Sequence, residues 1–526
     1  MEYLVTQSEM KQYDNNTITR LKMPSIVLME RAALVTVEEI RREKGAAVYR
    51  VLVVAGCGNN GGDGLAVGRM LMLQGCRVDF VLLGSREKCS EETSLQLAIL
   101  EQYGHSPYDR IPEGEYDIVI DAIFGVGLTR EIEGIYREAV RMINQMNSFV
   151  CAVDIPSGVH ADSGQILGCA VNADLTVTYG FYKLGQFLYP GAGCCGKIIC
   201  GQMGIDEHGF FGKRPGFYTY TSPKDVSLPV RRADGNKGTF GKVLVAAGSS
   251  TICGAALMAG RSVFRTGAGM VRIVSAQQNR NILQQTVPEA MLTVYDTTLW
   301  SEDGPDDAFI TAFREACDWA DCILIGPGIG TGKTAKWLFE QCLYESALPL
   351  VIDADGLNLL ASQTTASDAT FRTKFVRQRE RQPEREIILT PHLGEFARLF
   401  GCGIPEASRN LTIWPKELAD RLHCIVVCKD ARTIVACPGK EQIYVNTSGN
   451  AGMATAGSGD VLAGMITGLL AQGMEAEEAA VCGVFLHGMA GDMAAGIDGE
   501  RSMTATDIIG QIPRVFRAVE EGEKKI

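Results

Sequence analysis

Polar side chains gather in one glycine-dense segment of the first half of the chain. The apolar run Val51–Ala55 leads directly into GCGNNGGDG, and a helical pattern follows. These glycines loosely fit the GxGxxG fingerprint of dinucleotide-binding folds, with Asp79 at about the distance of the acidic residue that binds ribose. Asn59, Asn60 and Asp63 argue against a dehydrogenase, because a diphosphate there requires bare backbone. Amide and carboxylate oxygens suit a hard cation or a polar substrate instead.

Two further strand ends carry aspartates. Asp121 ends the apolar run DIVID, and Asp154 ends FVCAVD and precedes IPSG. Ligands of open parallel sheets bind beyond the carboxyl ends of the strands, so we expect both aspartates and the Asn-Asn loop in one crevice. A single aspartate is more often a turn former or a helix cap, but three convergent strand ends favour a site. Lys183, in GFYKLG, is a candidate cation or proton donor there, although a single lysine is usually a solvated surface residue.

A second glycine-dense loop lies in the other half of the chain. Gly449–Gly459 leads into an amphipathic helix whose first turn carries Asp460. Backbone N–H groups and the helix dipole at such a place bind phosphate, and an aspartate can accept a proton from a hydroxyl that attacks phosphorus. Aspartate also favours a first helical turn without any catalytic role. GPGIGTGKT resembles a phosphate-binding P-loop, but Pro327 stands where that motif needs glycine, so we reject P-loop chemistry.

Short β-branched runs alternate with helical patterns and must position these residues. This alternation predicts parallel sheets covered by helices on both faces, which makes the fold class α/β with two three-layer αβα domains. A Gly-, Pro- and charge-rich segment without a period indicates a boundary near residues 215–225, so we expect domains at 1–220 and 221–526. The charged stretch 366–386 reads as a surface insertion. The predicted strands are Val51–Ala55, Val78–Leu83, Asp117–Asp121, Phe149–Asp154, Leu175–Tyr179, Lys197–Cys200, Lys242–Ala247, Met270–Val274, Cys322–Gly326, Leu350–Asp353, Ile387–Thr390, Ile425–Cys428, Thr433–Ala436 and Ile443–Val445.

Composition excludes several classes of protein. The 526 residues carry a net charge of −12, which argues against binding to nucleic acid or to an acidic membrane surface. The N-terminal segment lacks the features of a signal peptide, and no apolar run approaches the ~20 residues of a membrane helix. The 17 cysteines include no CxxC pair, so we expect free thiols in a reducing cytoplasm. The 59 glycines are in excess, and many cluster after apolar runs, where backbone can approach a ligand closely.

Four segments of the first half, PSIVLMERAA, GCGNNGGDGLAVGRML, DAIFGVGLTR and DIPSGVHADSG, together resemble the NAD(P)H-hydrate epimerases. The resemblance implies a Rossmann-like domain that inverts the hydroxyl-bearing carbon of hydrated nicotinamide, and a potassium ion held by Asn60, Asp121 and Ser157. Asp154 is our first candidate for the general base or acid, with Lys183 left open as the alternative. The implied contacts with the hydrate are Asn59, Asn60, Gly61, Gly62, Asp63, Gly125, Val126, Gly127, Leu128, Thr129, Arg130, Glu131 and Asp154.

The second half contains the GxGD element of the ribokinase-like superfamily, and with RTGAGMVRI, GPGIG, DADGLN, LTPHLGEFARL and VVCKDART it resembles the ADP-dependent NAD(P)H-hydrate dehydratases. The resemblance implies that Asp460 deprotonates the ring hydroxyl, which takes the terminal phosphoryl of ADP. Phosphate then leaves, restoring NAD(P)H beside AMP, with Mg²⁺ on the nucleotide phosphates. NAGMATAGSGD replaces the usual NPGMATGGTGD, which leaves substrate fit open. The implied hydrate contacts are Ala255, Gly330, His392 and Asp460, and the implied nucleotide contacts are Lys429, Asp430, Ala431, Arg432, Thr433 and Gly459.

We therefore expect a bifunctional repair enzyme for NADHX and NADPHX, the hydrated forms of NADH and NADPH. The alternative is an ATP-dependent kinase of a small vitamin-precursor alcohol fused to a non-catalytic dinucleotide-binding module. Repair enzymes of this kind often self-associate, so we also expect a homo-oligomer. The preference between NADHX and NADPHX is open, and ADP is favoured over ATP by the resemblance alone.

Overall fold

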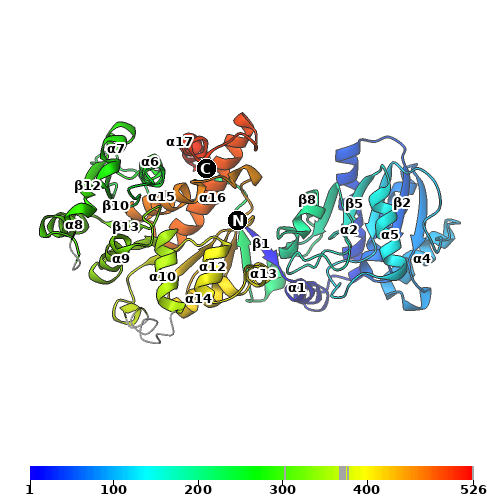
Figure 1. Cartoon of the computed structure of the whole chain (residues 1–526). Coiled ribbons are helices and arrows are strands. Elements are labelled where there is room, and N and C mark those ends of the chain that lie inside the picture. Colours follow the sequence, from blue (N-terminus) through cyan, green and yellow to red (C-terminus); the bar gives the residue numbers. More distant parts are fainter. Residues whose placement is uncertain (301–303, 366–374, 376–377, 524–526) are drawn as a thin grey trace. The chain divides into compact units, whose positions relative to one another are not determined.

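The structure is a computed structural model, and it describes residues 1–300, 304–365, 375 and 378–523. The chain divides into two compact units, Glu2–Tyr218 and Thr219–Ile526, with Met1 belonging to the second. Each unit has a mostly parallel sheet with helices on both faces (Figure 1). The expectation of two three-layer α/β domains is confirmed.

The N-terminal unit is built on six parallel strands in the order β3-β2-β4-β5-β6-β8. One core cluster joins α1, α2 and α3 to one face of this sheet, and a second joins α5 to the other face. A separate parallel pair, β1 with β7, places Val5 beside Lys183. The elements are β1 Glu2–Val5, α1 Gln7–Thr19, α2 Ser25–Lys44, β2 Arg50–Ala55, α3 Asn59–Leu73, β3 Arg77–Leu82, α4 Glu91–Gln102, β4 Ile118–Ala122, α5 Gly134–Gln145, β5 Phe149–Val153, β6 Leu175–Tyr179, β7 Tyr182–Lys183 and β8 Lys197–Gly201.

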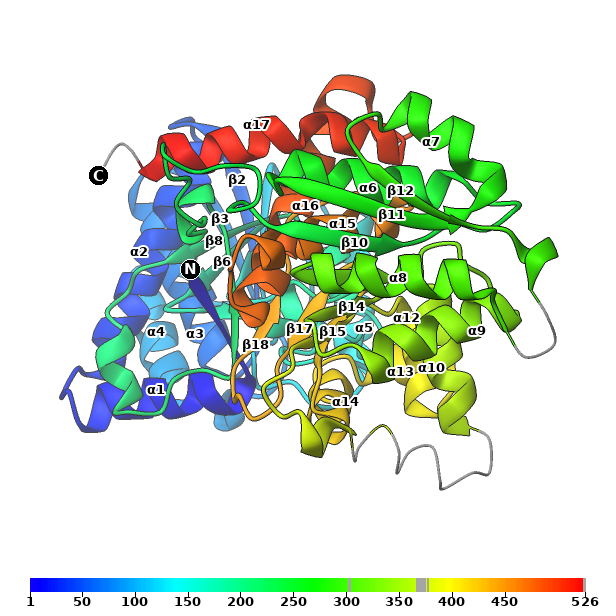
Figure 2. The same ribbon diagram turned by 90° about the vertical axis from the view of Figure 1, so that its left-hand side faces the viewer.

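The C-terminal unit has seven parallel strands, in the order β12-β11-β10-β13-β14-β15-β16, followed by antiparallel β17 and β18. Helices α6 and α8 cover opposite faces of this sheet (Figure 2). The strands are β10 Lys242–Ala246, β11 Met270–Ala276, β12 Met291–Tyr295, β13 Cys322–Ile325, β14 Leu350–Ile352, β15 Ile387–Leu389, β16 Ile425–Cys428, β17 Ile434–Ala436 and β18 Ile443–Val445. The helices are α6 Gly254–Thr266, α7 Arg280–Thr286, α8 Asp307–Trp319, α9 Lys333–Glu340, α10 Asp355–Thr365, α12 Leu393–Phe400, α13 Ile404–Arg409, α14 Trp414–Leu422, α15 Ser458–Ala471, α16 Ala476–Asp498 and α17 Ala505–Glu523.

Helix α16 is long and apolar enough to cross a membrane by length and composition alone. Within its most apolar 18-residue window, 67 % is buried inside the C-terminal unit, against α15, α17, β15 and β16. This burial accounts for its composition, because a helix that is apolar all round is typical of the core of a large domain.

The structure bears only in part on the interpretation of residues 366–386 as a charged surface insertion, and in the described part Glu380, Arg381 and Glu384 are exposed. Residues 366–374, 376 and 377 lie outside the described part, but Arg379 and Arg385 are buried, at 6 % and 5 % exposure. Arg385 donates to the carbonyls of Cys342, Leu343 and Leu348 at 2.6–2.8 Å. Burial lowers the pKa of Arg385 to about 10. Composition alone does not reveal that these two arginines donate hydrogen bonds to backbone carbonyls.

Candidate functional sites

Two cavities of the N-terminal unit meet beyond the carboxyl ends of its strands. Their volumes are about 520 Å³ and about 670 Å³, and they share five lining residues: Asn59, Asp63, Val126, Gly127 and Asp154. Asn59 and Asp63 come from the first turns of α3, Val126 and Gly127 from the loop after β4, and Asp154 from the end of β5. The structure thus brings together the three strand ends that the sequence singled out.

The glycine loop before α3 owes its shape to close backbone packing. A Cβ on Gly56 would lie 2.1 Å from the carbonyl oxygen of Ile123, and one on Gly61 would lie 1.9 Å from that of Gly56. Gly58, by contrast, has nothing within 4 Å of such a Cβ. The close packing of Gly56 and Gly61 therefore shapes the turn, and neither glycine lines either cavity.

Some of the remaining predicted contacts of this unit line a cavity, and others do not. Asn60 and every residue from Gly125 to Arg130 line the larger cavity. Gly61 and Gly62 are buried and line neither cavity, and Glu131 is exposed and lines neither. Asp79 also lines neither, because it lies in the middle of β3 and accepts hydrogen bonds from Arg50 and Tyr116. The dinucleotide fingerprint therefore lacks its acidic partner.

Asp154 is held in an unusual backbone conformation by a buried network. Its φ of +67° lies in the left-handed region, which costs on the order of 1 kcal/mol or more for a residue other than glycine. Lys183, only 1 % exposed, forms an ion pair with its carboxylate and donates to Thr178 Oγ1 at 2.8 Å. Thr178 Oγ1 in turn donates to Asp154 Oδ1 at 3.0 Å. Lys183 is thus not a surface residue, and strain of this kind is typical of functional sites.

Asp121 is a fully buried carboxylate. It accepts hydrogen bonds from Ser157, at 2.6 Å from the hydroxyl and 2.8 Å from the backbone N–H, and from the N–H of Ile123 at 3.3 Å. Burial raises its pKa to about 6, although these hydrogen bonds oppose the shift. Among the described residues no cationic side chain pairs with Asp121. A buried negative charge without a counter-charge favours a cation-binding site.

Asn60 lies near the same loop. Its side chain is 3.1 Å from where a Cβ of Gly125 would be, and its amide nitrogen is buried with no hydrogen-bond partner in the described part of the chain. A half-turn of the amide exchanges nitrogen for oxygen at that position. Asn60 can therefore offer a free oxygen close to the loop that Ser157 holds through the N–H of Phe124, at 2.9 Å.

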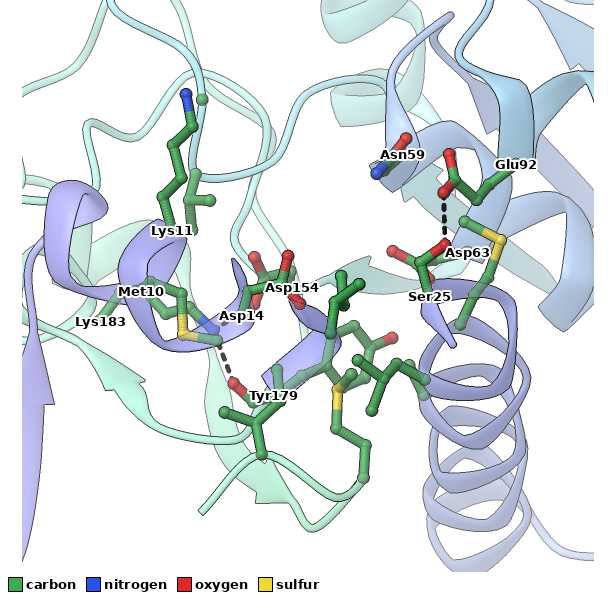
Figure 3. Close-up of a pocket in the computed structure, with 18 of the residues that line it drawn as sticks. Met10, Lys11, Asp14, Ser25, Asn59, Asp63, Glu92, Asp154, Tyr179 and Lys183 are labelled. Atoms are coloured by element: carbon green, nitrogen blue, oxygen red, sulfur yellow. Dashed lines mark hydrogen bonds and ion pairs between the residues drawn. The ribbon is translucent and has the colours of Figure 1, made fainter. Parts of the chain in front are cut away.

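Two further acidic residues enter the smaller cavity, and sequence reasoning missed both. Asp14 comes from α1 and Glu92 from α4, and Figure 3 shows them with Asp63 and Asp154 around one space. Burial and then the charge of Glu92 and Asp154 raise the pKa of Asp14. Neither residue follows a strand or a glycine loop, so the sequence carries no signal for them. Met10, Leu28 and Met29 add an apolar wall.

In the C-terminal unit, Asp460 lies in the first turn of α15 beside a lysine–aspartate pair. Lys429 Nζ is 2.7 Å from Asp353 Oδ1 and 3.1 Å from where a Cβ of Gly459 would be. Burial, and then the charge of Asp353, raise the pKa of Asp460 to about 7, and Lys429 opposes this shift. Burial lowers the pKa of Lys429, but Asp353 and neighbouring carboxylates more than offset it. This places a carboxyl that titrates near neutrality next to a cation at a helix N-terminus.

The other predicted hydrate contacts of this unit are His392, Gly330 and Ala255, which differ in exposure and in hydrogen bonding. His392 caps α12: its Nδ1 accepts from the N–H of Gly394 at 3.0 Å, and its side chain is 56 % exposed. Its backbone bridges to Lys429, so it lies near that pair. Gly330, at φ +76°, donates its N–H to Asp355 at 2.8 Å, and Ala255 is buried at the start of α6.

The predicted nucleotide segment Lys429–Thr433 connects β16 to β17. Asp430 and Ala431 are exposed, and Arg432 donates to the carbonyl of Thr447 at 3.1 Å. His487, which the sequence did not single out, approaches Ser458 at 3.4 Å, and burial lowers its pKa to about 4. Within the described ranges, no group of three or more His, Cys, Asp or Glu side chains could hold a metal ion.

Comparisons with known proteins give relatives for both halves of the chain. A family model described as NAD(P)H-hydrate dehydratase matches residues 243–514, and one described as YjeF-related protein N-terminus matches residues 25–185. A bifunctional NAD(P)H-hydrate repair enzyme of Moorella thermoacetica is 35 % identical over 99 % of this chain and 97 % of its own length. That of Thermofilum pendens is 35 % identical over 98 % and 96 %. An ADP/ATP-dependent NAD(P)H-hydrate dehydratase of Bacillus subtilis, co-crystallised with ATP and Mg²⁺, is 28 % identical, covers 56 % of this chain and 96 % of its own, and has a TM-score of 0.46.

Proposed function

The chain belongs to the family of bifunctional NAD(P)H-hydrate repair enzymes, and we propose how its two units divide the work. Residues 1–220 interconvert the R and S hydrates of NADH and NADPH, and residues 221–526 dehydrate the S form with ADP. One observation carries this proposal: each unit has an aspartate close to a lysine at the end of a strand or the start of a helix. The pairs are Asp154 with Lys183 in the first unit and Asp460 with Lys429 in the second.

In the N-terminal unit, the substrate occupies the two joined cavities. The apolar wall of Met10, Leu28 and Met29 suits the uncharged hydrated ring. Lys88 and Arg130, on the other cavity, suit the phosphates. Asp154 then serves as a proton acceptor at the hydroxyl-bearing carbon, and Lys183 keeps its carboxylate in place.

Potassium is the cation that we propose for Asp121, Ser157 and Asn60. These side chains fit it, because among the described residues Asp121 is a buried carboxylate without a cationic partner and the amide nitrogen of Asn60 has no hydrogen-bond partner. Neutral and anionic oxygens suit an alkali ion, and no sulfur or imidazole belongs to this set. A potassium ion held by these three residues would supply the positive charge that the carboxylate of Asp121 lacks.

In the C-terminal unit, Asp460 removes the proton of the ring hydroxyl. The hydroxyl oxygen then takes the terminal phosphoryl group of ADP, which leaves AMP. The lone pair of the ring nitrogen expels phosphate to give a carbon–nitrogen double bond, and loss of a proton from the adjacent ring carbon to solvent gives NAD(P)H. Lys429 meets the phosphates as a point charge at the N-terminus of α15. Since the described residues include no ready metal cage, we propose that Mg²⁺ is held mainly by the nucleotide phosphates.

The alternative of a vitamin-precursor kinase with a non-catalytic N-terminal module is not favoured. The family model for the second half is that of the dehydratases, and full-length repair enzymes match both halves of the chain. We also propose a cytoplasmic location, which is supported by 17 free cysteines. Self-association is proposed from the resemblance alone, and light scattering of the purified chain tests it.

The proposal is tested by incubating mixed R and S hydrates with ADP and Mg²⁺ and following NAD(P)H formation. The native chain converts both forms. Asp154→Asn converts the S form quickly and then stops, whereas Asp460→Asn forms no NAD(P)H but still equilibrates R with S.

Asp79→Asn is the control, because Asp79 lies in the same unit but outside both cavities. Rapid conversion by the native chain that ends when the S form is consumed would contradict the epimerase assignment. Phosphorylation of a small alcohol by ATP without hydrate turnover would favour the kinase instead.

A further inference from the structure

Asp63 is an acidic side chain in the wall shared by the two cavities of the N-terminal unit, and the resemblance implies only substrate contact for it. Within the described residues, no hydrogen bond or ion pair reaches its carboxyl group. It projects from the first turns of α3, which the close packing of Gly56 against Gly61 fixes in place. A fixed, unpartnered carboxyl group in a substrate cavity is available to the substrate.

The groups that face Asp63 are mostly acidic. They are Asp14 on α1, Glu92 on α4, Asp154 after β5 and Tyr179 on β6, with Lys183 on β7 and Lys11 on α1 as the cations of the cavity. Burial, and then the charges of Asp154 and Asp14, raise the pKa of Asp63 well above its usual range. Asp63 therefore favours its protonated form, whereas Asp154 has its negative charge balanced by Lys183.

Inversion at a hydroxyl-bearing carbon requires chemistry at both faces of the ring. The old hydroxyl departs from one face and needs a proton, and water adds at the other face and must lose one. Figure 3 shows Asp63 on one side of the cavity with Asn59 and Glu92, and Asp154 on the other with Lys183. One carboxyl group set among carboxylates and another paired with a lysine can divide such a task between an acid and a base.

We propose that Asp63 is the catalytic acid of the epimerase and that Asp154 is its basic partner. Asp63 gives its proton to the ring hydroxyl, the carbon–oxygen bond breaks, water leaves, and the lone pair of the ring nitrogen forms a carbon–nitrogen double bond. A second water adds at the opposite face, the electron pair returns to nitrogen, and Asp154 takes the released proton. Exchange with solvent returns both carboxyl groups to their starting states. The inference rests on the proposed epimerase activity and assigns the direction of proton flow within it.

The experiment measures epimerase kcat and KM against pH for the native chain, Asp63→Asn, Asp63→Glu and the control Asp79→Asn, after subtraction of the uncatalysed rate. Asp63→Asn keeps a hydrogen-bond donor but cannot transfer a proton, so we expect kcat to fall about 100-fold or more while KM changes little. The native rate falls on the alkaline side as Asp63 loses its proton. Asp63→Asn loses that alkaline limb, and Asp63→Glu retains a limb with part of the rate.

Thermal unfolding of each variant, with a Tm close to that of the native chain, shows that a loss of rate is not a loss of fold. The inference is overturned if Asp63→Asn keeps native kcat, or keeps the alkaline limb, or loses rate only through KM. Absence of epimerase activity in the native chain would overturn the proposed function itself, which is a distinguishable result.

Discussion

At the scale of single residues, the two lysine–carboxylate neighbourhoods differ in what the sequence reveals. Asp154 follows the end of a strand, and Asp460 lies in the first turn of a helix. Their positions in the sequence pattern were therefore enough to predict both as site residues. The sequence offers Lys183 as a candidate but does not predict its burial, because the contacts that bury it, to Thr178, Tyr179 and Asp154, arise only once β6 and β7 are folded. Long-range burial cannot be read from local pattern, and for the same reason Asp14 and Glu92 were missed.

We predict that Lys183→Met destabilises the N-terminal unit by about 3–5 kcal/mol, because it leaves Asp154 mostly buried without its cation. Denaturant unfolding measures the change. The double variant Lys183→Met with Asp154→Asn recovers part of the loss, since no charge remains unpaired. Equal stability of the single variant and the native chain would show that the pair contributes nothing.

The dehydratase rate should depend on the protonation of Asp460. The base must be ionised to accept a proton, and its pKa is raised to about 7, so kcat rises as pH increases through about 7 and is lost below it. A pH profile with saturating S hydrate and ADP shows the limb. Asp460→Asn should reduce kcat at least ~100-fold and remove the limb; a limb that survives this substitution belongs to another group.

Potassium should stabilise the N-terminal unit more than sodium does, because binding to the native state alone raises stability. The melting temperature of that unit is compared in equal concentrations of the two chlorides. Asp460→Asn keeps the difference, whereas Asp121→Asn loses it along with the buried charge. Equal shifts by the two salts in the native chain would argue against the Asn60–Asp121–Ser157 site.

At the scale of elements, apolar runs predicted the parallel strands because strands buried on both faces are continuously apolar. Strand β12, Met291–Tyr295, was missed because it is an edge strand with a mostly half-buried pattern. The strands β1 and β7 were also missed, because they have only four and two residues and so show no clear strand pattern. The glycine loop was found, but its individual glycines could not be sorted into structural and ligand-facing ones without coordinates.

That sorting yields a prediction about two glycines of one loop. Gly61→Ala should destabilise the N-terminal unit by at least ~2 kcal/mol, because the new Cβ would lie 1.9 Å from the carbonyl oxygen of Gly56. Gly58→Ala should leave stability within ~0.5 kcal/mol, since it meets nothing within 4 Å. Thermal unfolding of both variants measures the contrast, and similar melting temperatures would refute the packing argument.

At the scale of the whole molecule, the described residues of each candidate site belong to a single unit. The S hydrate made by one unit is the substrate of the other, and nothing in either site requires both on one polypeptide. An equimolar mixture of Asp154→Asn and Asp460→Asn chains should therefore convert R and S hydrates completely, although neither variant does so alone. If the mixture converts only the S hydrate that was present at the start, the S hydrate made by the epimerase unit is not released to solvent.

Helix α16 bears on how the chain is made. Before it folds, Ala476–Asp498 is an apolar stretch long enough to attract chaperones or membranes. It leaves the ribosome after β15, β16 and α15 but before α17, the element with which it makes its most extensive contacts. The order of elements along the chain therefore leaves one side of this segment uncovered until α17 has been synthesised.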